Sequence, residues 1–519
     1  MKHYLTNKQI GYFFFVIFLT LFFVFIFYVY YQRIVTFSFV DEFDNFVAAY
    51  FMLKKKILFS EIFHNRQPGM VYLSYLIQKV FNPQTLYQLV LYHRLFIIFF
   101  SFFMSILIIY KFRFAGVGFV LFYELIKYYS HGNLFQAESL IVYPLVYLLG
   151  LVFCKFQKKT ISDKDYLLAG IFAFFIIFMR EPYIPLTLFI YILILHNKEN
   201  IKIKYLSLII FLFLSAATFL LMPLRDYLYQ LIVVNLNSVV LNEIGSSGNF
   251  ITFFLKSFGY PIYILINGEL NHSHLVLMGL SLVFLIALFY YGFKLKKIKE
   301  VILIILIMGL AAVRAVPPGR PFFAAYKMLP WQAIFIMTIF FLISNLLSIK
   351  KTNKLATVLT FTLMVIFVFT FFSPRSYIWQ KVNRDEVFNI NYNRYYVNGE
   401  VVKILSKSTD KLFVDGYDSL IFWQSGLDSS YKYTLYYPIL KGIPYFSNER
   451  IQMFKESPPA FYFRDCIANK VLSLPRFIAD KYEFFKFNDK NSCLYIHKDK
   501  LRQISKNKLK EIEKFKYVL

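Results

Sequence analysis

Cysteine is scarce in this chain: the 519 residues include only three, at positions 154, 466 and 493. No spacing of His, Cys and carboxylate residues matches a closed zinc site. The sequence also lacks a glycine-rich loop that would cradle phosphate, and it lacks a dinucleotide-binding fingerprint. These absences leave a resident metal without support, and they favour a substrate that is not linked to a nucleotide.

Acidic residues are also few, with 30 Asp and Glu against 57 Lys and Arg, which gives a formal net charge of +27. Such an excess is typical of nucleic-acid-binding proteins. Here, however, the basic residues mostly lie in short loops between apolar runs, at 111–113, 155–164, 198–204, 294–299 and 350–354. That placement is typical of membrane topology, so we expect no nucleic-acid partner.

Hydrophobic residues dominate the chain: they make up 58% of it, including 65 Phe, and the mean hydropathy is +0.54. This composition excludes an ordinary soluble protein. A transmembrane helix needs roughly 20 apolar residues, and about eleven runs approach that length. We expect spans near 10–31, 93–110, 114–129, 137–154, 166–180, 182–195, 205–224, 274–293, 300–316, 327–348 and 355–373.

Three of these runs have distinctive features. The first is too long for the apolar part of a cleaved signal peptide and has no small-x-small cleavage site, so we take it as the first span. Pro182 prevents one continuous helix through 166–195, which predicts two short helices or a broken one. The run 300–316 is short for a span.

The distribution of Lys and Arg predicts the orientation. Lys2 and Lys8 precede the first run, every expected inner loop is basic, and the short turn 130–136 carries no Lys or Arg. The positive-inside rule then gives a cytoplasmic N-terminus and an extracytoplasmic C-terminal region. The predicted fold class is a polytopic α-helical protein of the cell membrane with a small C-terminal α/β domain.

We expect two domains, a transmembrane catalytic domain over 1–373 and an extracytoplasmic α/β domain over 374–519. Cys466 and Cys493 both fall in the second domain, where they form a disulfide or are two unrelated buried thiols. The stretch 498–519 is a basic amphipathic tail, either solvated or resting on anionic headgroups. Strands are predicted at Lys411–Val414, Ala460–Phe463 and Cys493–His497.

Two long loops are expected on the outer side. In the loop 32–92, apolar residues recur at helical spacing between Phe46 and Leu58, with three lysines beside them. This pattern predicts an amphipathic helix along the membrane surface. The loop 225–273 contains the segment Gly245–Gly248, which is typical of a lid or of a linker.

Three carboxylates, Asp41, Glu42 and Asp44, lie about ten residues past the first apolar run. Charges this close to a bilayer are costly unless they pair, hydrate or carry function. A carboxylate at the outer surface can act as a general base. The alternatives are a solvated charge or helix cap for Asp41, and a first-turn partner of the helix dipole for Asp44.

The order of Asp41-Glu42, a surface helix and the stretch His64–Tyr72 resembles the first external loop of the GT-C fold glycosyltransferases. The protein O-mannosyltransferase and aminoarabinose transferase families show the nearest likeness. Those families carry a Lys/His-Pro-Pro-Leu-type segment after the surface helix. Here Arg66-Gln67-Pro68-Gly69 stands in its place, so Pro68 and a nearby basic residue match.

Three later stretches resemble the same families: Asn133–Ser139, Met179–Pro182 and Pro318–Pro330. The first contains Glu138 where these families carry a second acidic residue. The second contains Arg180 in a basic-then-Pro turn between paired helices. The third is similar to a late Arg…His-Tyr-x-Leu-Pro segment, with Ala325 where His is expected.

The resemblance implies an integral membrane glycosyltransferase that takes a sugar from a polyprenyl-phosphate donor. The sugar would pass, with inversion, to a protein, lipid or glycan acceptor on the outer face. Asp41 or Glu42 would take the acceptor proton, and sequence does not choose between them. The donor phosphate leaves as an anion and needs cationic or hydrogen-bonding partners. The candidates are Arg66, Arg180, Arg320, Tyr326 and Lys327.

Each candidate also has a structural interpretation. Glu138 could serve only the helix dipole, Arg180 and Glu181 could neutralise one another, and Arg320 and Lys327 could be snorkelling anchors. A binding site for a divalent cation is a further alternative if folding brings together three candidate ligands, Asp41, Glu42 and Glu138.

Two other functions share the same features. A transporter or flippase of lipid-linked glycans would also have many spans and membrane arginines. No internal repeat of matched broken helices supports that class. A polymerase of surface polysaccharide would use the same chemistry as the transferase.

Overall fold

A computed structural model describes residues 7–196, 200–239, 262, 272–314, 325–374, 376–464, 476–485 and 493–515. The chain divides into two compact units, each built from three stretches. The first comprises Met1–Ile34, Arg94–Leu212 and Ile251–Asn383, and the second comprises Val35–His93, Phe213–Phe250 and Arg384–Leu519. This division differs from a single boundary near residue 373, because two earlier stretches group with the C-terminal region.

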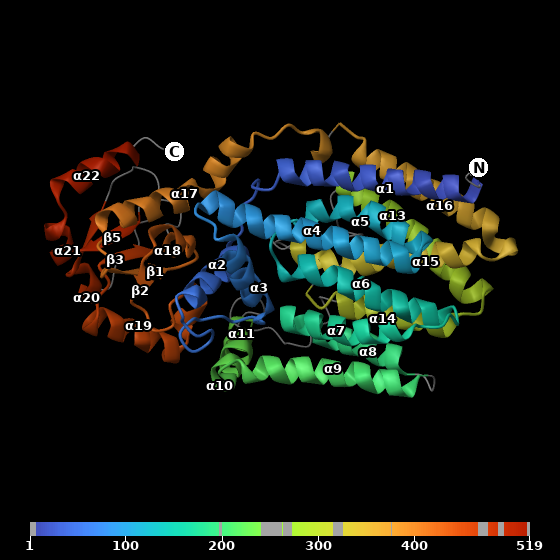
Figure 1. Cartoon of the computed structure of the whole chain (residues 1–519), viewed down its shortest axis with the longest axis horizontal. Helices are drawn as coiled ribbons and strands as arrows, with labels where there is room; N and C mark the ends of the chain where they lie inside the picture. The colour runs from blue at the N-terminus through green and yellow to red at the C-terminus, as the bar shows by residue number, and fades with distance from the viewer. Residues whose placement is uncertain are drawn as a thin grey trace, which may run out of the picture. The chain divides into compact units, whose positions relative to one another are not determined.

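Long apolar helices form the first unit (Figure 1). Two of the helices cross a unit boundary: the first residues of α4 and the last residues of α9 belong to the second unit. The helices are α1 (Asn7–Gln32), α4 (Leu86–Phe112), α5 (Phe114–Ile126), α6 (Ala137–Phe156), α7 (Asp163–Met179), α8 (Ile184–Leu195), α9 (Ile201–Leu220), α13 (His272–Phe289), α14 (Ile298–Ala311), α15 (Leu329–Leu347) and α16 (Asn353–Phe371).

Each expected span overlaps one of these helices, but not all of the helices are long enough to cross a bilayer. In the part of the chain that the structure describes, seven helices have the length and apolar composition of a span, in α1, α4, α6, α9, α13, α15 and α16. They indicate an integral membrane protein. The remaining four, α5, α7, α8 and α14, have 12 to 17 residues. The expected count of eleven spans is therefore not confirmed.

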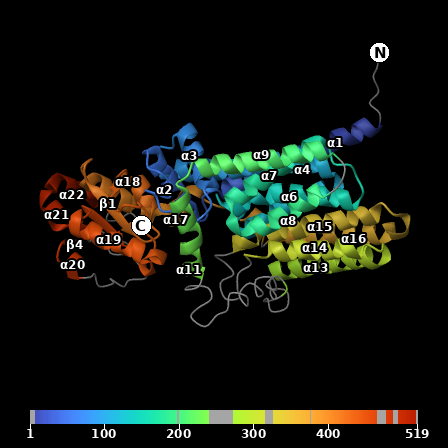
Figure 2. The same cartoon turned by 90° about the horizontal axis from the view of Figure 1, so that it is seen from below.

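The core of the first unit lies around α6 and α15, which are buried on nearly all sides. α15 packs against α5, α6, α13, α14 and α16, and Figure 2 shows α13, α14, α15 and α16 as neighbours. A helix that is apolar all round is expected in such a central position.

The predicted break in 166–195 is confirmed. α7 starts with a capping box between Ser162 and Asp165 and ends at Met179. Arg180 then has extended backbone, with φ of −155°, and a short 3-10 turn leads into α8 at Ile184. The proline in that turn removes a backbone donor, so two short helices form instead of one.

The first unit also contains a buried ion pair that the sequence analysis did not single out. Lys127 Nζ lies 2.6 Å from Glu124 Oε2, and both side chains are at most 1% exposed. The Tyr143 hydroxyl donates a hydrogen bond to Glu124 Oε1 over 2.5 Å and accepts one from Lys127 over 2.6 Å. Ser105 Oγ donates to the same carboxylate oxygen. These contacts compensate two charges that are removed from water.

The second unit combines shorter helices with a small sheet. Its helices are α2 (Val40–Leu53), α3 (Gly69–Phe81), α10 (Leu224–Leu228), α11 (Asn235–Val239), α17 (Arg384–Leu405), α18 (Leu420–Ser425), α19 (Pro444–Glu456), α20 (Arg476–Ala479), α21 (Lys498–Gln503) and α22 (Lys506–Ile512). Its strands are β1 (Lys411–Asp415), β2 (Asp428–Ser429), β3 (Phe461–Arg464), β4 (Tyr482–Phe485) and β5 (Leu494–His497).

The sheet has the order β2-β1-β3-β5-β4. β1 pairs in parallel with β2 and β3, while β5 pairs antiparallel with β3 and β4. The three predicted strands are confirmed as β1, β3 and β5, and a small α/β arrangement at the C-terminus is confirmed with them. β2 and β4 were not anticipated.

The surroundings of α2 differ from the prediction of a helix along the membrane surface. Phe43, Phe46, Val47 and Phe51 are fully buried, and the helix packs against α3 and α18. The Phe51 ring meets Phe422 of α18 edge-on, with centroids 5.3 Å apart. An apolar helix face suits protein and lipid equally well, and here protein covers it.

The cysteine prediction is answered in part. Cys154 is free, and Cys493 is in a disulfide. Cys466 lies outside the described residues, as does the Gly245–Gly248 segment predicted to be a lid or linker. Of the C-terminal tail, α21 and α22 are helical.

Candidate functional site

The acidic trio lies in the first turns of α2. The helix begins at Val40 after the extended residue Phe39, which makes no side-chain cap. Asp41 and Glu42 occupy the first turn, where a negative charge is favourable beside the helix dipole. The carboxylates are therefore held by a buried helix and do not lie in a loop before it.

Asp41 forms an ion pair with Arg66. Arg66 Nη2 donates to Asp41 Oδ1 over 2.6 Å, and about a quarter of each side chain is exposed. Arg66 lies just before α3, which starts at Gly69. The structure thus brings together two residues that were predicted from separate motifs, and solvent reaches both of them.

Asp44 lies one turn further along α2. The Tyr437 hydroxyl donates a hydrogen bond to Asp44 Oδ1 over 2.7 Å. Burial raises the pKa of Asp44 to about 7, against the lowering effect of Arg66. Asp41 raises this pKa further, while the Tyr437 hydrogen bond lowers it. Asp44 therefore changes its protonation state near neutral pH.

Glu42 faces a different environment from its neighbour Asp41. Its side chain is fully buried, so it is closed to an acceptor molecule. The geometry thus favours Asp41 and Asp44 over Glu42 as carboxylates that can meet a substrate.

The pKa of Asp44 has a consequence for stability. Folded protein holds this proton up to about pH 7, whereas an unfolded Asp loses it near pH 4. Between those values the folded state binds more protons, so its free energy of unfolding falls as pH rises. The melting temperature of Asp44→Asn minus that of the parent should therefore increase from about pH 4 to pH 7 and stay constant above pH 7. Thermal unfolding in nanodiscs measures this difference.

Asp428→Asn is the control, because Asp428 is at an exposed position. Its melting temperature should equal that of the parent at each pH. If the difference between Asp44→Asn and the parent does not increase with pH, the pKa given for Asp44 is contradicted.

A second polar cluster lies in the first unit, around Glu138 at the start of α6. Arg180 Nε donates to Glu138 Oε1 over 3.1 Å, and Arg314 Nη1 donates to the same oxygen. Arg180 and Glu138 are almost completely buried. Two guanidinium groups thus share one carboxylate, and Arg180 also pairs with Glu181, whose Oε1 lies 3.9 Å from Arg180 Nη1.

Tyr326 and Lys327 belong to this cluster. The Arg314 guanidinium lies 5.9 Å from the centre of the Tyr326 ring, and the Tyr183 hydroxyl donates to the backbone oxygen of Lys327 over 3.2 Å. Three predicted site residues, Glu138, Arg180 and Tyr326, are therefore neighbours, and the Lys327 backbone lies beside them. Arg320 lies outside the described residues.

Polar atoms without partners adjoin this cluster. Both side-chain amide atoms of Gln136 and the hydroxyl of Ser139 are buried and have no hydrogen-bond partner in the structure as far as it is described. Gln136 is the N-cap of α6 and Ser139 lies in its first turn, on either side of Glu138. Buried polar groups are usually satisfied, so these atoms leave hydrogen-bonding capacity for a ligand.

Arg314 and Tyr437 were missed by the sequence analysis. Arg314 lies at the end of the short apolar run 300–316, and an arginine so close to the hydrocarbon was itself a signal of function. Tyr437 had no such signal, because it meets Asp44 from 393 residues away in the sequence.

Neither cluster resembles a metal centre. Within the described residues, no group of three or more His, Cys, Asp or Glu side chains could hold a metal ion. Asp41 and Glu42 lie in the second unit and Glu138 in the first.

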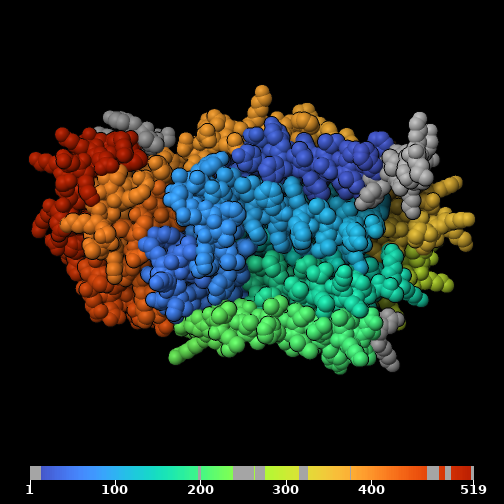
Figure 3. Space-filling view, viewed as in Figure 1, coloured from blue at the N-terminus to red at the C-terminus, as the bar shows by residue number. Residues whose placement is uncertain are grey.

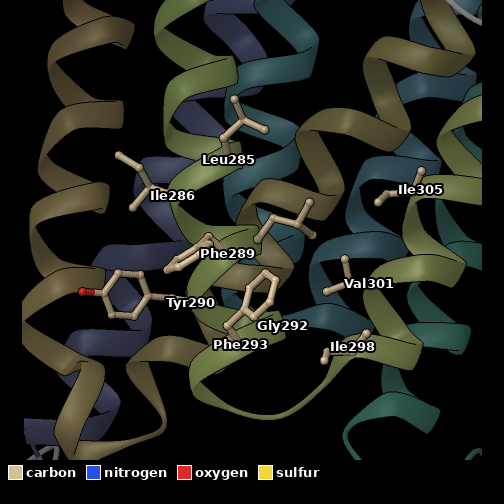
Figure 4. A pocket seen from close by; sticks show the side chains of 10 residues that line it. Leu285, Ile286, Phe289, Tyr290, Gly292, Phe293, Ile298, Val301 and Ile305 are labelled. Carbon is tan, nitrogen blue, oxygen red and sulfur yellow. The ribbon is translucent and has the colours of Figure 1, made fainter.

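An apolar cavity of about 660 Å³ lies between α13 and α14 (Figure 4). Its lining includes Leu285, Phe289, Phe293, Val301 and Ile305. It opens beside the first half of α14, whereas Arg314 follows the last residue of that helix, so the cavity is separate from the Glu138 cluster.

No protein-family model, curated protein or solved structure matches this chain. The chemistry of the two clusters is therefore the guide to function.

Proposed function

We propose that this protein is a membrane glycosyltransferase that moves a sugar from a polyprenyl-phosphate donor to an acceptor on the outer face of the membrane. The observation that carries the proposal is the pair of carboxylates on α2, Asp41 and Asp44, in contrasting environments. Neighbouring carboxylates whose environments differ in this way are a recurring mark of acid–base chemistry.

In this proposal Asp44 is the general base. A base works best when its pKa is close to the working pH, and the pKa of Asp44 is about 7. The acceptor hydroxyl would give its proton to Asp44 as its oxygen attacks the anomeric carbon, and the bond from that carbon to the phosphate oxygen would break. Asp41, paired with Arg66, would supply negative charge beside the developing positive charge of the sugar ring. A single displacement inverts the configuration.

The leaving phosphate requires positive charge where water is scarce. In the second unit, Arg66 keeps this role beside Asp41. In the first unit, Arg180, Tyr326 and Lys327 keep it as a separate group, as does Arg320, which lies outside the described residues. Arg314 joins them, because it shares the Glu138 carboxylate with Arg180. The hydrogen-bonding capacity left on Gln136 and Ser139 also suits a phosphate or a sugar hydroxyl.

The direct test supplies labelled polyprenyl-phosphate sugars to the protein in nanodiscs and measures release of polyprenyl phosphate. We expect Asp41→Asn to lower turnover roughly tenfold to a hundredfold, the usual range for losing a charged hydrogen bond. Asp428→Asn is the matched control, because it removes an exposed carboxylate that pairs with Lys54 at the other end of α2. It should leave turnover unchanged.

Two results would count against the transferase. Turnover of both Asp41→Asn and Asp44→Asn equal to that of the parent, with the fold intact, would remove the α2 carboxylates from the site. Labelled donor that crosses liposomes without being consumed would identify a flippase.

A further inference from the structure

The helical stretch 224–239, formed by α10, a π-helical turn Tyr229–Val234 and α11, has two contrasting faces. One face carries Leu224, Leu228, Ile232 and Leu236, with side chains 40% to 51% exposed. These residues repeat every four positions. The wider turns of a π-helix, which bonds residue i to i+5, keep them in one stripe. Exposed leucines and isoleucines in such a row mark a surface that contacts lipid or another protein.

The opposite face is polar and buried, and it holds the loop that carries Arg66. Gln230 Oε1 accepts from the backbone N–H of His64 over 2.8 Å, and its Nε2 donates to the Phe59 oxygen. The Tyr227 hydroxyl donates to Gln67 Oε1 over 2.9 Å. These bonds secure the chain on both sides of Arg66.

A further pair of bonds lies at the next turn. Asn65 Nδ2 donates to Asn235 Oδ1 over 2.9 Å, and Asn235 Nδ2 donates to the Asn65 oxygen over 2.6 Å. Asn65 directly precedes Arg66, which pairs with Asp41. The position of the Arg66 guanidinium thus depends on where the helical stretch 224–239 lies.

Continuity with α9 identifies what covers the stripe. α9 has the length and apolar composition of a membrane span and is mostly exposed. It ends at Leu220, and α10 begins at Leu224. Leu220, the last residue of α9, and Leu221, which follows it, are also strongly exposed. Figure 3 shows the residues of α9 and of the following helix, in green, at the molecular surface. A span followed within four residues by an amphipathic helix places that helix at the hydrocarbon boundary.

We propose that the stripe Leu224–Leu236 inserts into the lipid of the outer leaflet, and that this insertion sets the position of the Arg66 loop. The basic residues at the start of this span, Lys198 before α9 and Lys202 and Lys204 in its first turn, put the far end of the span on the outer side. Lipid contact on one face and the polar bonds on the other then tie the Arg66–Asp41 pair to the membrane surface. The helix that was expected to lie along the membrane surface at Phe46–Leu58 is buried. In this proposal the stretch 224–239 lies along the membrane surface instead.

The insertion is tested with spin labels in nanodiscs, in a Cys154→Ser background that removes the free thiol. A label at Ile232→Cys should collide more often with oxygen, which concentrates in lipid, than with a water-soluble nickel chelate. A label at Arg225→Cys, on an exposed polar position of the same helix, should show the reverse ratio. Equal exposure of both labels to the chelate overturns the proposal. Shielding of the Ile232→Cys label from both reagents also overturns it, because protein would then cover the stripe.

The coupling is tested by hydrogen exchange in residues 59–67. In Leu228→Asn/Ile232→Asn the amide of His64 should exchange about fivefold faster or more, because a loosened helix no longer holds its partner. Arg225→Asn should behave as the parent. Gln230→Ala removes the hydrogen bond directly and sets the scale. If Gln230→Ala speeds exchange while the double variant does not, lipid contact does not set the loop. Neither readout needs sugar transfer, so failure of the proposed function and failure of this inference are distinguishable.

Discussion

Replacing Asp44 by Asn should lower sugar transfer by about 10²- to 10⁴-fold, the range that general acid–base catalysis contributes. The Asn amide cannot take the proton from the hydroxyl of the acceptor molecule, although its oxygen can still accept the hydrogen bond that Tyr437 donates. In the parent, kcat/KM should fall as pH drops below about 7, because the pKa of Asp44 lies there and protonation removes the base. The variant should lose this limb. Initial rates of polyprenyl phosphate release between pH 5 and 9 provide the measurement.

Tyr437→Phe separates a base from a merely structural carboxyl. The Tyr437 hydrogen bond lowers the pKa of Asp44, so its loss should move the acidic limb to higher pH while the maximal rate changes less. Tyr445→Phe is the control, because Tyr445 is exposed and packs against Tyr433 away from the carboxyl. A pH profile of Tyr437→Phe that coincides with the parent would show that Asp44 does not govern the reaction.

Replacing Lys127 by Met should destabilise the protein by about 3–5 kcal/mol, the cost of leaving one partner of a buried ion pair uncompensated. The Glu124 carboxylate would still accept the hydrogen bonds from Tyr143 and Ser105, but it would lose its ion-pair partner. The double variant Glu124→Gln/Lys127→Met removes both charges and should recover most of the loss. Melting temperatures in nanodiscs measure both effects.

Lys297→Met is the matched control for this pair. Its partner, Glu300, lies 2.7 Å away, but both side chains reach solvent, so the expected cost is below about 1 kcal/mol. If Lys127→Met costs no more than Lys297→Met, the Glu124–Lys127 pair does not support the fold. If the double variant is as unstable as the single one, packing around Met, rather than the unpaired charge, explains the loss.

The helices of the first unit were predictable because each apolar run specifies its own helix, as in α6 and α15. The break at Arg180 followed from one proline. The number of spans did not follow, because short runs such as that of α8 suit a buried helix as well as a crossing one. Likewise, the apolar face of α2 is the same pattern whether lipid or α18 covers it. β2, with two residues, is too short to leave a periodic signal.

For the site, sequence located charged residues but not their environments. The motifs led to Asp41, Arg66, Glu138 and Arg180, which form ion pairs. The pKa of Asp44 was out of reach, because it depends on burial and on a tyrosine far along the chain. The burial of Glu42 was equally hidden, since neighbouring residues of a helix point in different directions.

The contact between α2 and α18 constrains how the protein is made. α2 ends at Leu53 and α18 begins at Leu420, so the ribosome must add more than 360 residues before the two can meet. At typical translation rates this takes roughly 20 to 70 seconds. During that interval α3 can already cover part of α2, but Phe51 lacks its partner Phe422, so a chaperone or the lipid surface must shelter this side chain. Truncated chains that stop before Leu420 should be prone to aggregation for this reason.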